Sequence, residues 1–86
     1  MPESDIHVPE RLEFPTDRAV DHLDVRNLGP PEPLRKTLET LSTTDSVVLQ
    51  INDRAPKFLY PKLEDRGFEY ETVETDDAVL TAIWKP

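Results

Sequence analysis

The chain has 86 residues and no cysteine, so it is long enough for one small domain and too short for two separate cores. Without a thiol, disulfide bonds, thiolate metal sites, persulfide transfer and cysteine nucleophiles are all excluded. Eighteen acidic residues against ten basic residues give a formal net charge of −8, which disfavours binding to nucleic acid or to an anionic membrane surface.

The charge and the first residues also indicate where the protein works. Four lysines accompany the eighteen acidic residues, a balance typical of a salt-rich cytoplasm, where screening removes the self-repulsion of an acidic surface. We therefore expect a halophilic source and a fold that loosens at low ionic strength; an ordinary solvated acidic surface is the alternative. No apolar run is long enough for a transmembrane helix, and Met1 to Asp5 is acidic where a signal peptide is basic and apolar. These features predict a cytoplasmic protein without membrane contact.

Residues 1–20 contain three prolines, many charges and scattered apolar residues without a sustained period. This composition predicts a flexible, acidic, Pro-containing N-terminal tail, for which a disordered end is favoured over a partner-binding role. The tail can touch the core through Ile6, Val8, Leu12 or Phe14. The folded domain is expected over residues 21–86.

The first half of that domain predicts strand, helix, strand. Residues 22–26 alternate between apolar and polar side chains, as a half-buried strand does. Leu34, Leu38 and Leu41 form one apolar stripe on a helix over residues 31–43. Residues 47–51 are β-branched and largely apolar, which is typical of a well-buried strand.

The second half predicts helix, strand, strand. A helix that starts near Lys57 or later and ends at Gly67 accommodates Pro61 only in its first turn, and residues 56–59 then form a tighter turn. Gly67 suits the left-handed position just past the helix end, with Phe68 folding back on the last turn. Residues 68–73 and 78–84, joined by a short polar turn at 75–77, are expected to form an antiparallel hairpin.

This order of elements, βαβαββ, defines an α+β fold. Right-handed crossovers place both helices on one face of a four-stranded mixed sheet, in a two-layer sandwich whose other face is partly open.

The helix start carries a resemblance to a known family. Leu23-Asp24, Leu28 and Pro31-Glu32-Pro33 resemble the sulfur-carrier proteins of the TusA/SirA type, whose signature is a Leu-Asp strand, a Gly-Leu turn and Cys-Pro-x-Pro at the first helix. Asn27 stands where glycine is usual in that family, and Pro30 occupies the position of the carrier cysteine. The resemblance implies the TusA/SirA-like fold, which is similar to the C-terminal domain of translation initiation factor 3. It also implies that sulfur carriage is lost.

The chain is more closely similar to an uncharacterised TusA-like domain-of-unknown-function family that is abundant in haloarchaea. That resemblance spans residues 22–84 and rests on Leu23 to Arg26, Leu28 to Leu34, Asn52 to Pro56 and Leu63 to Gly67. It implies an accessory role near metal, oxygen or nitrogen-oxide chemistry, because members of the family occur alongside hemerythrin-like domains.

Proline at the carrier position also changes the local electrostatics. Free N–H groups at a helix start stabilise anions, but Pro30, Pro31 and Pro33 remove three such donors and Glu32 adds a negative charge. Phosphate binding at this helix start is therefore disfavoured.

The first two strands are expected to be parallel neighbours, so the polar residues at their C-terminal ends share one edge, where ligands tend to bind in open sheets. The candidate ligand-binding or partner-binding residues at this edge are Asp24, Arg26, Asn27, Asn52, Asp53, Arg54 and Lys57. Their arginines can hold a small polar or anionic ligand. The structural alternative is that Asp24–Arg54 or Arg26–Asp53 pairs fix the loops, and that Asn52 or Asp53 caps the second helix.

The histidines and the aromatic residues give weaker support for a functional site. His7 and His22 have no spaced carboxylate companions, so no metal site and no cofactor are expected. Phe68, Tyr70 and Trp84 are expected in the core. The alternative is that Tyr70 or Trp84, and similarly Tyr60, forms an apolar patch for a partner or a dimer.

These features favour a non-enzymatic accessory or protein-interaction module, monomeric or weakly dimeric, that binds another protein. The second hypothesis is a sensor or enzyme subunit that binds a small polar or anionic molecule between Arg26 and Arg54. An RNA-associated protein ranks last because of the net charge.

Overall fold

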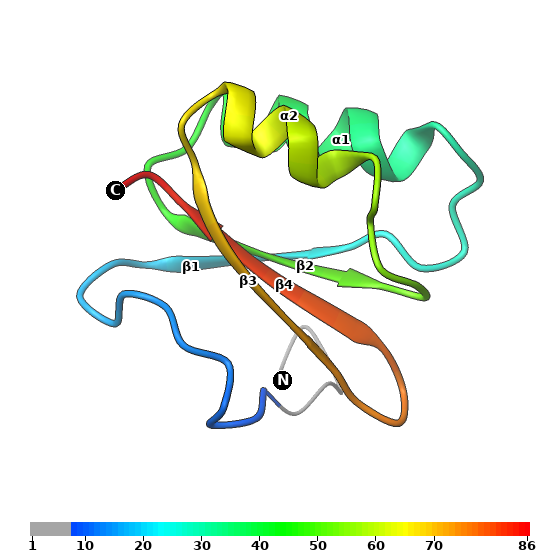
Figure 1. Ribbon diagram of the computed structural model, residues 1–86, viewed down its shortest axis with the longest axis horizontal. Helices are drawn as coiled ribbons and strands as arrows, with labels where there is room; N and C mark the ends of the chain where they lie inside the picture. The colour runs from blue at the N-terminus through cyan, green and yellow to red at the C-terminus, as the bar shows by residue number, and fades with distance from the viewer. Residues whose placement is uncertain (1–7) are drawn as a thin grey trace.

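The computed structural model describes residues 8–86 as two helices packed on one face of a four-stranded sheet (Figure 1). The elements in chain order are β1 (Val20–Asp24), α1 (Glu32–Leu41), β2 (Val47–Asn52), α2 (Leu59–Asp65), β3 (Glu69–Glu74) and β4 (Val79–Trp84). Within these residues, no helix is both long and apolar enough to cross a membrane.

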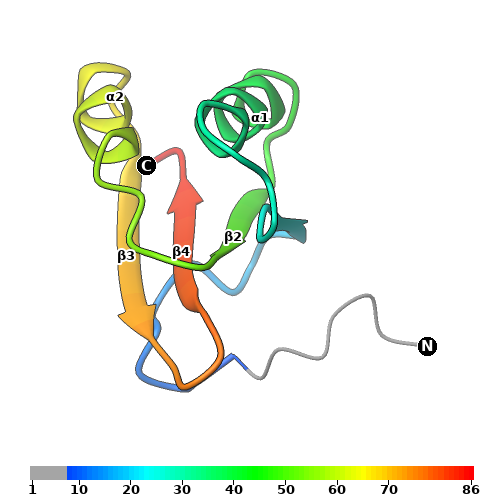
Figure 2. The ribbon, with the colours of Figure 1, turned by 90° about the vertical axis from the view of Figure 1, so that its right-hand side faces the viewer.

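The strand order is β1-β2-β4-β3, with β1 parallel to β2 and the other two pairs antiparallel. Figure 2 shows both helices on the same side of this sheet. The predicted α+β fold and its mixed sheet are therefore confirmed. Because β1 and β2 run in the same direction, their C-terminal ends meet at one edge.

The prolines near its start and the glycine after its end explain where helix α2 begins and ends. The Leu59 amide donates to the Pro56 carbonyl over 2.9 Å, which forms the predicted turn before the helix. Pro61 is the third residue of α2, in the first turn as predicted. Gly67 has a φ of 77°, and the Phe68 amide donates to the Leu63 carbonyl over 2.9 Å. The predicted helix end is therefore confirmed.

Helix α1 is shorter than the predicted range of 31–43, since Pro31 is its N-cap and Ser42 its C-cap. Its apolar stripe packs as predicted on the helix side of the sheet. Strand β1 begins two residues earlier than predicted, at Val20.

The core has two apolar clusters, one on each face of the sheet. The cluster under the helices contains Leu41, Val48, Leu59, Leu63 and Ile83. The cluster on the opposite face contains Leu12, Val47, Leu49, Ile51, Ala78, Leu80 and Ala82. Every residue of β2 is buried, so the centre of the sheet is covered on both sides. On the face opposite the helices, His22 of β1 and Glu69 and Glu71 of β3 are exposed, which agrees with the expectation of a partly open face.

The N-terminal segment, residues 8–19, packs on the face of the sheet opposite the helices (Figure 1). Leu12 is 4% exposed within the cluster on this face, called the lower cluster below, and Val8 and Phe14 pack against that cluster. Trp84 of β4 packs against the same cluster. The expected contacts of Val8, Leu12 and Phe14 with the core are confirmed, whereas Ile6 lies outside the described residues. The flexibility expected of residues 1–20 stays a prediction.

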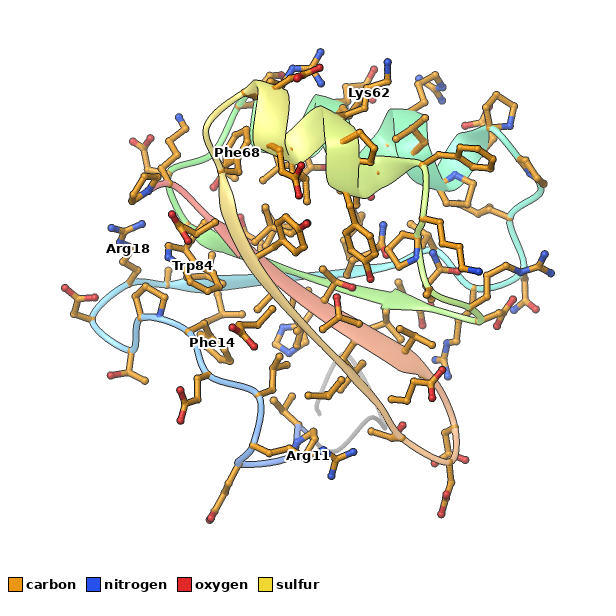
Figure 3. The ribbon with its side chains drawn as sticks, viewed as in Figure 1. Arg11, Phe14, Arg18, Lys62, Phe68 and Trp84 are labelled. Carbon is orange, nitrogen blue, oxygen red and sulfur yellow. The ribbon has the colours of Figure 1, made fainter. Side chains whose placement is uncertain are left out.

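Two arginines attach this segment to opposite ends of the β3–β4 hairpin. Arg11 donates to the Glu74 carbonyl where β3 ends, and Arg18 Nη1 donates to the Lys85 carbonyl over 2.5 Å. Both side chains come from the N-terminal segment in Figure 3. The segment is thus held by polar contacts at its ends and by apolar contacts between them.

Candidate functional site

A pocket of about 470 Å³ lies between the β1–α1 and β2–α2 connections. These connections follow the C-terminal ends of the two parallel strands (Figure 1). One wall is the start of α1 and the other is the β2–α2 loop. Its lining residues are Leu28, Pro30, Pro31, Pro33, Leu34, Gln50, Asn52, Asp53, Arg54, Ala55, Pro56, Lys57, Phe58 and Leu59. The walls are therefore mostly prolines and other apolar side chains.

The floor of the pocket is polar and belongs to β2. Gln50 is 0% exposed and Asn52 is 7% exposed. Gln50 Nε2 donates to Thr37 Oγ1 of α1 over 2.8 Å, and Asn52 Nδ2 donates to Gln50 Oε1 over 3.2 Å. Two buried amides and a buried hydroxyl thus satisfy one another below the apolar walls.

The two ends of this series of hydrogen bonds determine which group donates and which accepts in each bond. The Thr37 hydroxyl lies 2.7 Å from the Pro33 carbonyl, which can only accept, so Thr37 Oγ1 must accept from Gln50. The Asp53 amide donates to Asn52 Oδ1 over 2.7 Å. The amide groups of Gln50 and Asn52 are therefore both oriented by backbone groups, one from each wall.

This orientation leaves specific hydrogen-bonding capacity at the floor. Each amide nitrogen carries two hydrogens, and one of each is used within the chain of bonds. No acceptor among residues 8–86 takes the second hydrogen of Gln50 or of Asn52. Asn52, which is 7% exposed, can therefore offer an N–H donor at the base of the pocket, and the fully buried Gln50 orients it from below.

The mouth of the pocket carries the exposed apolar side chains. Leu28 is 37% exposed and Phe58 is 84% exposed, and these are the large exposed hydrophobic residues of the described part of the chain. Arg54 and Lys57 are also exposed, and neither forms an ion pair or side-chain hydrogen bond with another residue in 8–86. The mouth thus combines apolar surface with two cations.

The predicted edge divides into two groups. Asn52, Asp53, Arg54 and Lys57 line the pocket, whereas Asp24, Arg26 and Asn27 lie outside its lining. The two groups remain connected, since the Asn27 amide, at a φ of 73°, donates to Asp53 Oδ2 over 3.4 Å.

The ion pair at this edge forms within one strand end. Arg26 Nη2 lies 2.7 Å from Asp24 Oδ2, and Arg26 Nε donates to Asp24 Oδ1 over 3.0 Å. The hydrogen bonds from Arg26 hold the pKa of Asp24 below its usual value. The N-cap of α2 is Phe58, and no side chain caps it, so the capping role considered for Asn52 or Asp53 is wrong.

Pro30 lines the pocket immediately before Pro31, the N-cap of α1. The position that resembles a carrier cysteine therefore forms part of the apolar wall.

The aromatic residues of the hairpin are half-buried against the two core clusters. Phe68 and Tyr70 pack on the helix-side cluster, and Trp84 packs on the lower one. The Tyr60 and Tyr70 rings stack at 4.9 Å, and the Tyr70 hydroxyl donates to Glu64 Oε2 over 2.7 Å. This hydrogen bond raises the pKa of Tyr70 to about 12. Because these side chains are half-buried, the alternative of an apolar patch on them stays a prediction.

Sequence reasoning missed four of the residues that shape the pocket: Thr37, Gln50, Leu28 and Phe58. Gln50 had a visible signal, since it is the one polar residue inside the apolar run of residues 47–51. His22 was considered and lies exposed on β1. In the described part of the chain, no three His, Asp or Glu residues are grouped to hold a metal ion.

Comparison with known proteins agrees with this architecture. The family model described as "Uncharacterized conserved protein (DUF2249)" matches residues 22–85. The crystal structure of a SirA-like protein from Desulfitobacterium hafniense is similar, with a TM-score of 0.63 and 20% identity. The similarity covers 76% of this chain and 93% of that one. No curated protein matches the chain.

Proposed function

The chain belongs to the DUF2249 family of uncharacterized conserved proteins, and within that family we propose that it is a non-enzymatic interaction module that binds another protein at the mouth of its pocket. The observation that carries this proposal is the exposure of Phe58 and Leu28 at the mouth. An exposed aromatic residue beside a concave apolar wall is typical of the centre of a protein interface.

The chemistry of the pocket supports a binding role rather than a catalytic one. Its buried polar groups are the amides of Gln50 and Asn52, which do not exchange protons near neutral pH and are weak nucleophiles. At the position of a carrier cysteine, Pro30 supplies no reactive group.

Charge suggests what kind of partner is bound. The net charge of −8 attracts a basic protein at long range and repels nucleic acid and anionic lipid. The proposed partner has an apolar protrusion that contacts Phe58 and Leu28, acidic groups beside it that face Arg54 and Lys57, and a surface that is otherwise basic. Its association rate falls as salt rises.

A small ligand is the second candidate, supported by the donors at the pocket floor. A ligand held between Arg26 and Arg54 is not proposed further, because Arg26 lies outside the pocket lining and binds Asp24.

Photo-crosslinking in native cells tests the protein-binding role. The photoreactive residue p-benzoylphenylalanine replaces Phe58 in one variant and Lys62 in the control. Lys62 is an exposed residue of α2 outside the pocket lining. We expect one discrete adduct from position 58, none from position 62, and loss of the adduct when Leu28→Ser is added. Identical adducts from both positions, or an adduct that persists with Leu28→Ser, would contradict the proposal.

A further inference from the structure

We propose that the pocket binds a small molecule with a compact apolar body and one carboxylate group. This site lies below the mouth where a protein partner is proposed to dock, and its existence does not depend on that partner.

The volume of the pocket fits a small molecule. Pockets for small ligands typically measure about 300–1,000 Å³ and are mostly apolar with a few placed polar groups. The volume here is about 470 Å³. Pro30, Pro33 and Pro56 line it, and their rings are rigid, so the walls lose little conformational entropy when an apolar body binds.

The floor of the pocket selects for a hydrogen-bond acceptor. Gln50 and Asn52 each keep one N–H hydrogen that no residue in 8–86 accepts. Their donor orientation is enforced from the Pro33 carbonyl at one end and the Asp53 amide at the other. The floor is therefore preorganised, and it does not reorient to receive a ligand donor without breaking buried bonds.

The mouth of the pocket selects for negative charge on that acceptor. Arg54 and Lys57 line the same pocket and have no ion-pair partner among the described residues. The one acidic lining residue, Asp53, accepts the Asn27 amide through Oδ2. A carboxylate can accept from the Asn52 amide, which is 7% exposed, and from Arg54, with charge-assisted bonds that a neutral group does not form.

Three probes with the same phenyl group and chain length separate these requirements: 3-phenylpropionate, 3-phenylpropionamide and 3-phenylpropylamine. Each is titrated into the ¹⁵N-labelled full chain, and side-chain and backbone N–H signals are followed by NMR. We expect the acid to shift the side-chain NH₂ signals of Gln50 and Asn52. The amide should bind about tenfold more weakly, because charge-assisted hydrogen bonds are about twice as strong as neutral ones. The amine should not bind.

Exposed variants test the cations without endangering the fold. Arg54→Gln and Lys57→Gln should each weaken binding of the acid several-fold, and Lys62→Gln, outside the pocket, should leave it unchanged. A lack of shifts at Gln50 and Asn52 with every probe would overturn the proposal. So would acid and amide binding with equal affinity, or shifts limited to Arg54 and Lys57, which would indicate surface ion association. None of these results affects crosslinking at position 58.

Discussion

Gln50 of β2 and Thr37 of α1, both fully buried, are joined by a hydrogen bond of 2.8 Å between Nε2 and Oγ1. This bond links the central strand to the helix whose start forms one wall of the pocket. It also orients the Gln50 amide, and through it Asn52. The geometry of the pocket floor is therefore coupled to the packing of α1 on the sheet.

Replacing Gln50 by leucine should destabilise the fold. The variant leaves the buried Asn52 Nδ2 without its acceptor, and an unsatisfied buried polar group costs about 1–3 kcal/mol. Urea denaturation measures the loss. In Thr37→Val/Gln50→Leu the two losses should not add, because the residues share one bond. Additive losses would show that this bond does not couple strand to helix.

Leu12→Ala should destabilise the protein by about 2–5 kcal/mol, the range for leucine truncation in a core. Leu12 is 4% exposed beneath the sheet, so the N-terminal segment contributes to stability although it forms no helix or strand. Leu28→Ala, at a side chain that is 37% exposed, is the matched control and should change stability by less than about 0.5 kcal/mol. Equal unfolding midpoints for the two variants would refute this role of the segment.

Tyr70 should ionise at a higher pH than an ordinary tyrosine. The hydrogen bond to Glu64 raises its pKa from 10.0 to about 12. A raised pKa means that the stabilisation is fully present below pH 10 and is lost as the pH rises toward about 12. NMR titration of ring-labelled tyrosine measures this pKa, and Glu64→Gln should move it toward the ordinary value. An unchanged Tyr70 pKa in that variant would assign the shift to another cause.

The pKa of Asp24 should be lower than that of an ordinary aspartate, because the Arg26 side chain donates hydrogen bonds to its carboxylate. A lowered pKa means that the stabilisation is present above the usual value of 3.8 and is lost as the pH falls through the folded-state value. Both side chains are partly exposed, so the contribution should stay below about 1 kcal/mol. Carboxyl-carbon NMR should show a higher Asp24 pKa in Arg26→Gln and no change in Arg35→Gln.

The net charge of −8 predicts a melting temperature that rises with salt. Raising KCl from about 0.1 to about 1 M shortens the Debye length from about 10 to about 3 Å, which screens repulsion among surface carboxylates. Glu69 and Glu71 are exposed on the edge strand β3. The double variant Glu69→Gln/Glu71→Gln should therefore show a smaller rise. The same rise in both proteins would point to salt effects other than screening.

Local patterns in the sequence determined most of the secondary structure. Period-two alternation, the leucine stripe of α1 and the position of Pro61 each act within a few residues, because they depend on backbone geometry. Gly67 could be assigned for the same reason, since its left-handed conformation is a property of one residue and its neighbours.

Contacts between segments that are far apart in the sequence determined the packing of the N-terminal segment and the geometry of the pocket floor. Val8, Leu12 and Phe14 have no period of their own, and their burial depends on the sheet face that they meet. The pocket floor likewise needs Pro33, Thr37, Gln50 and Asp53, which come together only when α1 packs on β2. The sequence by itself therefore specified the type and order of the elements and that no cysteine occupies the helix start. Only the tertiary structure turned a lone polar residue in an apolar strand into the base of a pocket, because hydrogen-bond direction is set by partners far apart in the chain.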